Sequence, residues 1–139
     1  MLTDHFRELF LKSSAVNSTR SAILNESLIS IENTAGSHLS FLAHAVIQQN
    51  NGYHLFVLPD KEEALYFVND LENNFNKNRG TTLLFYPASY SRPYQIIDPD
   101  PTCVLQRTEV IDALSKQRKK LLVVTYPEAI VEKVIDKNR

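Results

Sequence analysis

The segment from Asn33 to Phe41 holds the residues whose types and spacing come closest to a nucleotide-binding site. It reads Asn-Thr-Ala-Gly-Ser-His-Leu-Ser-Phe and joins an expected strand to an expected helix, which is where a phosphate loop lies. Such a loop needs glycines whose backbone N–H groups surround phosphate, a lysine for the outer phosphates and a hydroxyl for magnesium. A complete loop at this place would bind and hydrolyse a nucleoside triphosphate.

Only part of this equipment is present. If Gly36 and Ser37 keep the loop register, His38 stands at the next glycine position, Leu39 at the lysine position and Ser40 at the hydroxyl position. Leu39 brings no charge, and His38 crowds a turn that favours glycine. The three glycines of the chain are too far apart for an intact Walker or Rossmann fingerprint. We therefore expect a degenerate loop with no catalytic residue, cofactor or metal, and an ordinary strand-to-helix turn is the favoured interpretation.

The basic cluster of the chain comprises Lys116, Arg118, Lys119 and Lys120, between an expected helix and an expected strand. Contact with phosphate or DNA is one interpretation of such a cluster. A solvated loop that complements the C-terminal end of the preceding helix is the favoured one.

Other residue types with possible chemistry lack partners in the sequence. The histidines, at positions 5, 38, 44 and 54, have no metal-ligand spacing. Cys103 has no neighbouring histidine; Arg107, one turn further on, would lower the pKa of its thiol, but an inert buried thiol is the commoner case. Ser89 has no glycine-flanked elbow, and Asp60 is better explained as a helix cap than as a phosphoacceptor.

The composition is that of an ordinary soluble domain. The chain has 139 residues, of which 43% are hydrophobic and 22% charged, and a formal net charge of −1. This balance gives no global attraction to nucleic acid or membrane. The single cysteine excludes an internal disulfide and fits a reducing compartment, and neither a signal peptide nor a membrane-spanning run is visible. We expect a cytoplasmic protein.

The elements that would position these residues alternate along the chain. An amphipathic helix is expected over 1–13, with Leu2, Phe6, Leu9 and Phe10 on one face, and a linker over 13–21. Strands are expected at 28–31, 54–58, 81–86 and 121–124, and helices at 36–49, from 60 to the polar stretch 73–80, at 102–116 with Thr102 as cap, and at 128–134. Residues Ala64, Val68, Leu71 and Phe75 would face inward from the second of these helices, and Leu105, Ile111 and Leu114 from the third.

This alternation predicts an α/β fold, a three-layer sandwich with a small, mainly parallel sheet. Ligands bind past the carboxyl ends of the strands in such sheets. These ends fall at 32–37, 59–60, 87–91 and 125–126.

Taken together, several segments resemble one known family. They are the loop at 33–41, His-Leu-Phe-Val-Leu-Pro-Asp at 54–60, Leu-Leu-Phe-Tyr-Pro-Ala-Ser-Tyr-Ser-Arg-Pro-Tyr at 83–94, Leu-Gln-Arg at 105–107 and Leu-Leu-Val-Val-Thr-Tyr-Pro-Glu-Ala-Ile at 121–130. Their order over residues 20–135 resembles the N-terminal part of the bacterial transcription-repair coupling factor, whose first domain is similar to that of excinuclease B. The resemblance implies a degenerate P-loop, RecA-like half. It also implies no DNA-clasping hairpin after Tyr94, because only about eight residues separate it from the next helix.

The resemblance implies a larger parent, a DNA-dependent ATPase whose separate motor pushes stalled RNA polymerase off lesions. Its N-terminal module recruits excinuclease A, mainly through a small domain inserted near the point that corresponds to Arg139. The expected partners are the rest of the parent and, through other domains, excinuclease A, RNA polymerase and DNA, but no membrane. We expect residues 1–21 to be a helix and linker, and 22–139 an α/β domain cut before that insertion.

Three functions follow from these observations. The first is a non-catalytic structural lobe of a nucleotide excision repair factor that positions the surface recruiting excinuclease A. The second is a small phosphate- or nucleotide-binding domain that uses the Gly36–Ser40 turn. The third is a stand-alone interaction domain that docks partners through the 1–13 helix. The sequence leaves the oligomeric state open.

Overall fold

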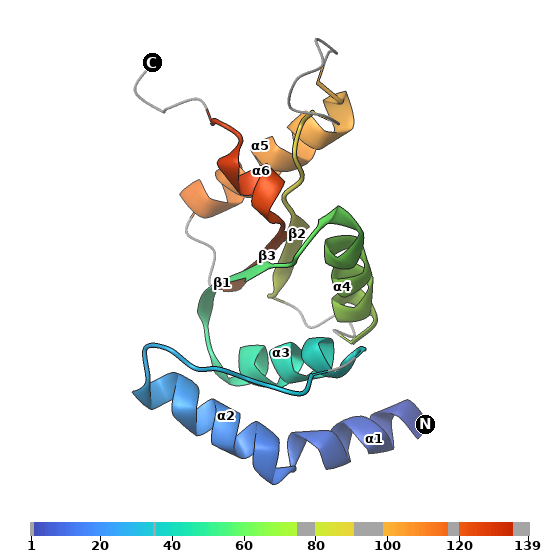
Figure 1. Cartoon of the computed structure of the whole chain (residues 1–139), viewed down its shortest axis with the longest axis vertical. Helices are drawn as coiled ribbons and strands as arrows, with labels where there is room; N and C mark the ends of the chain where they lie inside the picture. Colours follow the sequence, from blue (N-terminus) through green and yellow to red (C-terminus); the bar gives the residue numbers. More distant parts are fainter. Residues whose placement is uncertain (1, 35, 75–79, 91–98, 117–119, 135–139) are drawn as a thin grey trace. The chain divides into compact units, whose positions relative to one another are not determined.

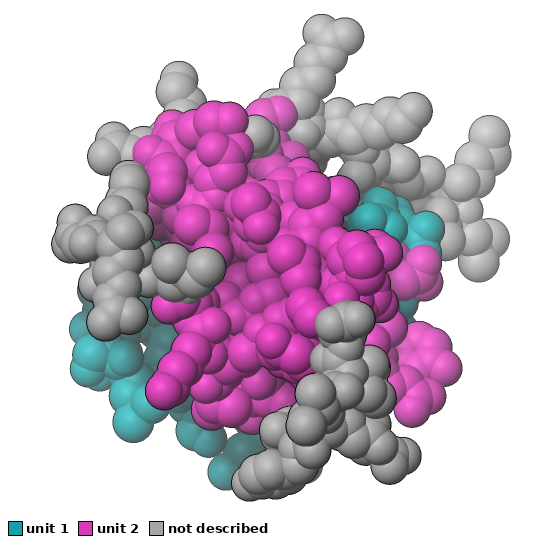
Figure 2. Space-filling view, turned by 90° about the horizontal axis from the view of Figure 1, so that it is seen from above, with its two compact units in different colours: residues 1–51, 70–76 teal, residues 52–69, 77–139 magenta. Residues whose placement is uncertain are grey.

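The computed structural model describes residues 2–34, 36–74, 80–90, 99–116 and 120–134. The chain divides into two compact units, coloured separately in Figure 2. Unit 1 comprises residues 1–51 and 70–76, and unit 2 comprises residues 52–69 and 77–139. The boundary at residue 21 that the sequence suggests stays a prediction.

Unit 1 is built from helices. They are α1 (Leu2–Leu11), α2 (Ser14–Asn25) and α3 (His38–Gln49), drawn in blue to cyan in Figure 1. The end of α4 (Lys61–Asn74), from Asp70 onward, also belongs to this unit. The core of the unit contains the buried side chains of Val16, Leu42 and Ala45, against which Phe10 and Leu11 pack. The helices expected near 1–13 and 36–49 are thereby confirmed.

The predicted linker over 13–21 is wrong, because these residues begin helix α2. The Ser13 hydroxyl accepts a hydrogen bond from the Val16 N–H, as an N-cap serine does. Val16 is buried, and Arg20 donates to the Ala45 carbonyl oxygen at 2.9 and 3.2 Å. Serine, asparagine and threonine weaken a helix only by tenths of a kcal/mol each (about 0.5). Packing on α3 outweighs that cost.

Two other expectations for the N-terminal half are also wrong. Residues 28–31 form no strand, and Leu28 and Ile31 are exposed. Leu9 was expected on the buried face of the first helix, but it is 57% exposed, whereas Phe10 is half-buried. The side chains of Leu2 and Phe6 lie outside the described part of the chain.

Unit 2 contains a parallel sheet, as the sequence predicted. Within the described residues its strands are β1 (Gly52–Val57), β2 (Thr82–Phe85) and β3 (Lys120–Thr125), in the order β1-β3-β2. The register pairs Leu55 with Val123 and Leu84 with Val123. Residues 121–125 are all buried, because β3 is central and covered on both faces.

Helices α4 (Lys61–Asn74), α5 (Pro101–Ser115) and α6 (Pro127–Val131) follow the three strands. Val110 and Ala113 of α5 pack against Leu121 and Val123 on one face of the sheet. On the other face, the ring of Phe67 in α4 lies 5.2 Å from that of Phe56. Among the described residues, no helix has the length and apolar character needed to cross a membrane.

The sequence predicted which residues of α4 and α5 face inward, and the structure confirms the described residues of the first set but not the second. In α4, Ala64 and Leu71 are buried and Val68 is half-buried, as expected, while Phe75 lies outside the described residues. In α5 the prediction is wrong: the residues expected to face inward, Leu105, Ile111 and Leu114, are 68%, 41% and 44% exposed.

The buried residues of α5 are Arg107, Val110 and Ala113. The helix turns its arginine inward because that guanidinium finds carbonyl and carboxylate partners there, as described below.

Strand β1 lies at an edge of the described sheet and leaves one of its faces largely uncovered. Tyr53, Leu55 and Val57 are 52%, 63% and 49% exposed, while the alternate residues His54 and Phe56 are half-buried. The register puts the exposed residues on the same face as Leu121 and Val123, where α5 packs. α5 therefore covers β3 on this face but leaves β1 exposed.

Candidate functional site

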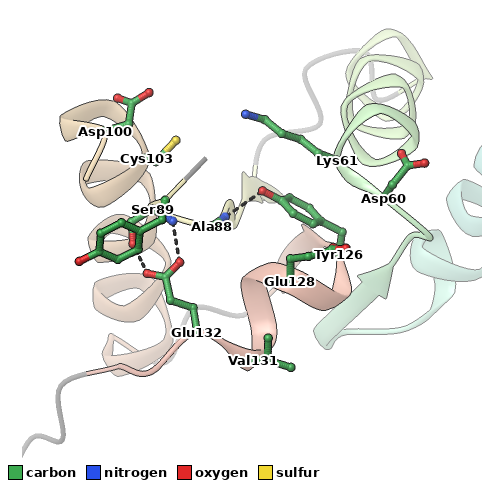
Figure 3. A pocket seen from close by; sticks show the side chains of 11 residues that line it. Asp60, Lys61, Ala88, Ser89, Asp100, Cys103, Tyr126, Glu128, Val131 and Glu132 are labelled. Atoms are coloured by element: carbon green, nitrogen blue, oxygen red, sulfur yellow. Dashed lines mark hydrogen bonds between the residues drawn. The ribbon is translucent and has the colours of Figure 1, made fainter. Parts of the chain in front are cut away.

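The candidate site of unit 2 is an open pocket of about 600 Å³ at the carboxyl ends of the strands (Figure 3). Its described lining comes from the starts of α4 and α5, the segment after β2, and α6. The lining residues are Asp60, Lys61, Ala88, Ser89, Tyr90, Asp100, Cys103, Tyr126, Glu128, Val131 and Glu132. Three of the four strand ends singled out in the sequence, at 59–60, 87–91 and 125–126, contribute to it. The volume falls in the range of small-ligand sites.

Two helices that open onto the pocket are capped by the chain's own carboxylates. An Asp60 oxygen accepts from the Glu63 N–H at 2.8 Å, which confirms Asp60 as a cap. For α5 the cap is Asp100 and not Thr102, as was expected; an Asp100 oxygen accepts from the Thr102 N–H at 2.8 Å. That hydrogen bond holds the pKa of the Asp100 carboxyl below its ordinary value. These N–H groups are the ones that would otherwise face an anionic ligand.

Arg107 fixes the segments that form the floor of the pocket. One of its guanidinium nitrogens donates to the Pro87 carbonyl at 2.8 Å and to the Ala129 carbonyl at 3.1 Å. Its Nε lies 3.6 Å from a Glu132 carboxylate oxygen, and its guanidinium carbon lies 4.2 Å from the centre of the Tyr86 ring. A buried guanidinium is stable only with such a set of partners.

Glu132 continues this network into the pocket. Its carboxylate accepts from the Ser89 N–H at 2.7 Å and from the Ser89 hydroxyl (dashed lines in Figure 3). Beside it, the Tyr126 hydroxyl accepts from the Ala88 N–H at 2.9 Å. Ser89 is therefore held by a carboxylate, and Arg107 balances the charge of that carboxylate. None of the described residues that line the pocket is a histidine.

Cys103 lies in the pocket wall on α5, where its surroundings disfavour the thiolate form. Partial burial raises the pKa of its thiol, and the Asp100 carboxylate raises it further, against an opposing effect of Lys61. Arg107, which the sequence suggested would lower this pKa, points its guanidinium instead at Pro87 and Ala129. A thiol with a raised pKa carries less thiolate at neutral pH.

The predicted degenerate loop lies in unit 1 and forms the start of α3. Gly36 adopts a φ of +54°, a conformation that suits glycine. Ser40, at the hydroxyl position, is buried; its hydroxyl lies 2.8 Å from the Ser37 carbonyl and 3.2 Å from an Asp70 oxygen. Leu39, at the lysine position, is 40% exposed. The ring of His38 lies 5.3 Å from that of Phe10, edge to face.

The remaining residues singled out in the sequence do not form a site in the described part of the chain. Lys116 pairs with Asp112 at 2.6 Å on the surface of α5, and Lys120 begins β3. Arg118 and Lys119 lie outside the described residues, so a phosphate or DNA contact of the basic cluster stays a prediction. Among the residues described, no three histidine, cysteine or acidic side chains are grouped to hold a metal ion.

Sequence reasoning missed Arg107 and Glu132 as partners. The sequence points to such partners only indirectly. An arginine on the helix face that packs against the sheet must have hydrogen-bond acceptors nearby, but the sequence does not say which residues supply them.

Comparison with protein-family models, with curated proteins and with solved structures finds no match for this chain.

Proposed function

We propose that the chain is a non-catalytic structural lobe of a transcription-coupled nucleotide excision repair factor. In this role it positions the surface that recruits excinuclease A to RNA polymerase stalled at a lesion. The parentage rests on the ordered segments that resemble the transcription-repair coupling factor between residues 20 and 135. The absence of nucleotide chemistry in this lobe rests on the residues at the degenerate loop.

The engagement of Ser40 is the observation that carries the non-catalytic part. A magnesium-binding hydroxyl in a phosphate loop must face the nucleotide. Here the Ser40 hydroxyl is turned inward, against the Ser37 carbonyl and the Asp70 carboxylate. The neighbouring Leu39 supplies no cation for a triphosphate. These contacts support a packing role for the turn.

The carboxyl edge of the sheet supports the same proposal. In α/β proteins this edge holds phosphates at helix N-termini. In this chain Asp60 and Asp100 already accept hydrogen bonds from the N–H groups that begin α4 and α5. A phosphate would have to displace or approach two carboxylates. The three parallel strands, each followed by a helix, support the finer proposal of a three-layer sandwich derived from a P-loop, RecA-like half.

Calorimetry with ATP and magnesium tests the non-catalytic part. We expect no micromolar binding to the chain. Micromolar binding that is lost in Ser40→Ala would instead establish the alternative, a nucleotide-binding domain that uses the Gly36–Ser40 turn.

A matched gain-of-function variant sharpens this test. Restoring His38→Gly and Leu39→Lys together should return at most weak phosphate binding, because both changes supply groups that a phosphate loop uses. No turnover is expected. ATPase activity of this double variant would contradict the proposed role of the turn.

The coding sequence downstream of Arg139 tests the parentage separately. Helicase motifs in the same reading frame are expected. An unrelated domain there would remove the repair assignment and leave the conclusions on nucleotide chemistry unchanged.

A further inference from the structure

We propose that strand β1 pairs in the antiparallel direction with β1 of a second copy of this chain, so that two sheets join edge to edge in a two-fold dimer. The proposal goes beyond the structural role above and does not depend on the family resemblance. It rests on the open backbone edge of β1, on the way its sequence complements itself and on the lack of charge along it.

The backbone of β1 has one side on β3 and one side open, because β1 is an outer strand of the described sheet (Figure 1). The Leu58 N–H, directly after the strand, donates to the Thr125 carbonyl of β3 at 2.9 Å. Since backbone groups alternate in direction along a strand, the N–H and C=O groups of Tyr53, Leu55 and Val57 face the open side. In the described part of the chain these three residues have no hydrogen-bond partner there.

The two outer strands of the described sheet differ in how well they are protected. β2 has only four residues, and all of them are half-buried. β1 has six residues without proline or a charged side chain, and its alternate residues are exposed. Natural proteins usually protect outer strands by shortness, proline or charge. β1 is therefore the edge that is open to a further strand.

The sequence of β1 complements itself in the antiparallel direction. In such a pair, residues whose N–H and C=O groups face the partner lie opposite one another and exchange two hydrogen bonds. With the two-fold axis at Leu55, this residue lies opposite Leu55 of the second copy, and Tyr53 lies opposite Val57. Pairs of aromatic and β-branched side chains stabilise antiparallel sheets. A register shifted by two residues would place one of the three opposite a residue outside β1.

The charges of the chain do not oppose this pairing. Gly52–Val57 contains no acidic or basic side chain apart from His54. Asp60, the first acidic residue after the strand, would lie at the opposite end of the pairing from Asp60 of the second copy. The net charge of −1 leaves little repulsion between the two molecules. A strand of the same sequence thus meets neither like charges nor unpaired backbone groups at this edge.

The association of the full 139-residue chain tests the proposal directly. A pair of short strands is a small interface, and small interfaces give weak, reversible complexes. In sedimentation equilibrium the apparent mass should therefore rise with concentration from 15.9 kDa toward twice that value. A chain that remains monomeric up to about 1 mM would overturn the proposal.

A charge exchange at the two-fold axis tests the register. Leu55→Glu and Leu55→Arg each place like charges directly opposite one another, so each variant alone should dimerise at least about tenfold more weakly. An equal mixture of the two variants should form dimers again, because a carboxylate then faces a guanidinium. The matched controls are Leu105→Glu and Leu105→Arg, at a leucine of α5 that is similarly exposed, and each should dimerise as the unmodified chain does.

Disulfide formation between copies tests the same register without adding charge. In a Cys103→Ser background, Leu55→Cys should form a linked dimer with oxidised glutathione, because Cα atoms of such an opposed pair lie about 5.5 Å apart. Tyr53→Cys is the control, since its counterpart in the second copy would lie four residues along the strand, roughly 13 Å away. It should not link to itself, but it should link to Val57→Cys when the two are mixed.

Two further results would overturn the proposal. One is a mixture of the Leu55 charge variants that stays monomeric although circular dichroism shows both to be folded. The other is a Tyr53→Cys variant that links to itself as readily as Leu55→Cys does, which would indicate a different packing of the two copies. If a charge variant fails to fold, the cysteine variants decide. A monomeric chain leaves the non-catalytic role intact, because ATP calorimetry tests that role independently.

Discussion

The turn before α3 and the carboxyl edge of the sheet differ in how far their polar groups are buried and hydrogen-bonded within the protein. At the turn, the Ser40 hydroxyl is buried and bonded within unit 1. At the edge, Asp60, Asp100 and Glu128 remain exposed around a pocket. The region that looks like a binding motif in the sequence is thus internally satisfied. The region without a motif keeps groups that face outward.

This difference separates two roles that a polar residue can have, one in stabilising the fold and one at the surface. A buried hydroxyl held by neighbouring backbone and carboxylate stabilises the fold, whereas Asp60 and Asp100 cap helices and still line a pocket. The distinction depends on burial, which a motif alone does not report.

The largest effect is expected from Arg107→Ala, which breaks the floor of the pocket. The change leaves the Glu132 carboxylate without its cation, and it leaves the carbonyls of Pro87, Ala129 and Glu132 without their donor. Removing one member of a buried charge network costs about 3–5 kcal/mol of unfolding free energy. Chemical denaturation followed by circular dichroism measures the loss.

Arg20→Ala is the matched control in unit 1. Arg20 donates only to the Ala45 carbonyl and is half-buried, so the expected loss is about 1 kcal/mol. Equal losses for the two variants would contradict the structural role assigned to Arg107. Arg107→Lys should recover only part of the stability, because lysine lacks the planar fork.

A smaller effect is expected from Ser40→Ala at the turn. The alanine removes contacts to Ser37 and Asp70, which predicts a loss of about 1 kcal/mol in unfolding free energy. Thermal unfolding in the absence of nucleotide measures it. Full stability in this variant would show that the hydroxyl is not needed for packing, and would weaken the contrast between the two regions.

The smallest effect concerns the pH dependence of Cys103. Because burial and Asp100 raise the pKa of its thiol, alkylation should reach half of its maximal rate at a higher pH than for an unperturbed thiol. Asp100→Asn removes a negative charge that disfavours the thiolate, so the midpoint should fall. A midpoint that rises or stays constant would contradict the placement of Asp100 beside Cys103.

Asp100 itself carries a linked consequence with the opposite sign. Its folded pKa lies below the unfolded value because the carboxylate accepts from the Thr102 N–H. The cap is therefore fully stabilising above the unfolded pKa and is lost as pH falls through the folded one. A ¹³C titration of the Asp100 carboxyl should give a midpoint below the ordinary pKa of an aspartate without such hydrogen bonds.

The sequence predicted the parts of the fold that local pattern determines. The buried run in β3, the Asp60 cap and the helix at α3 depend on apolar periodicity and capping chemistry, and the structure confirms them. The sequence also indicated the place of the carboxyl-edge pocket, because the carboxyl ends of the strands of a parallel sheet meet at one edge.

The misses arise where long-range contacts outweigh local pattern. Residues 13–21 looked polar enough for a linker, but Val16 finds a core that includes Leu42. The predicted inward face of α5 was wrong because a pattern of apolar residues places an arginine on the outward face. In the structure Arg107 faces inward, where it contacts Pro87, Ala129 and Glu132. Partners 20 to 25 positions away in the chain cannot be inferred from spacing.

The uncovered face of β1 has a practical consequence for anyone who purifies this chain. Tyr53, Leu55 and Val57 form an exposed apolar row on a strand at the edge of the described sheet, and a net charge of −1 provides little electrostatic repulsion between molecules. Concentrated solutions of the protein should therefore aggregate at neutral pH. A charged substitution in that row, such as Leu55→Lys, should keep the protein dispersed at small cost to its folding.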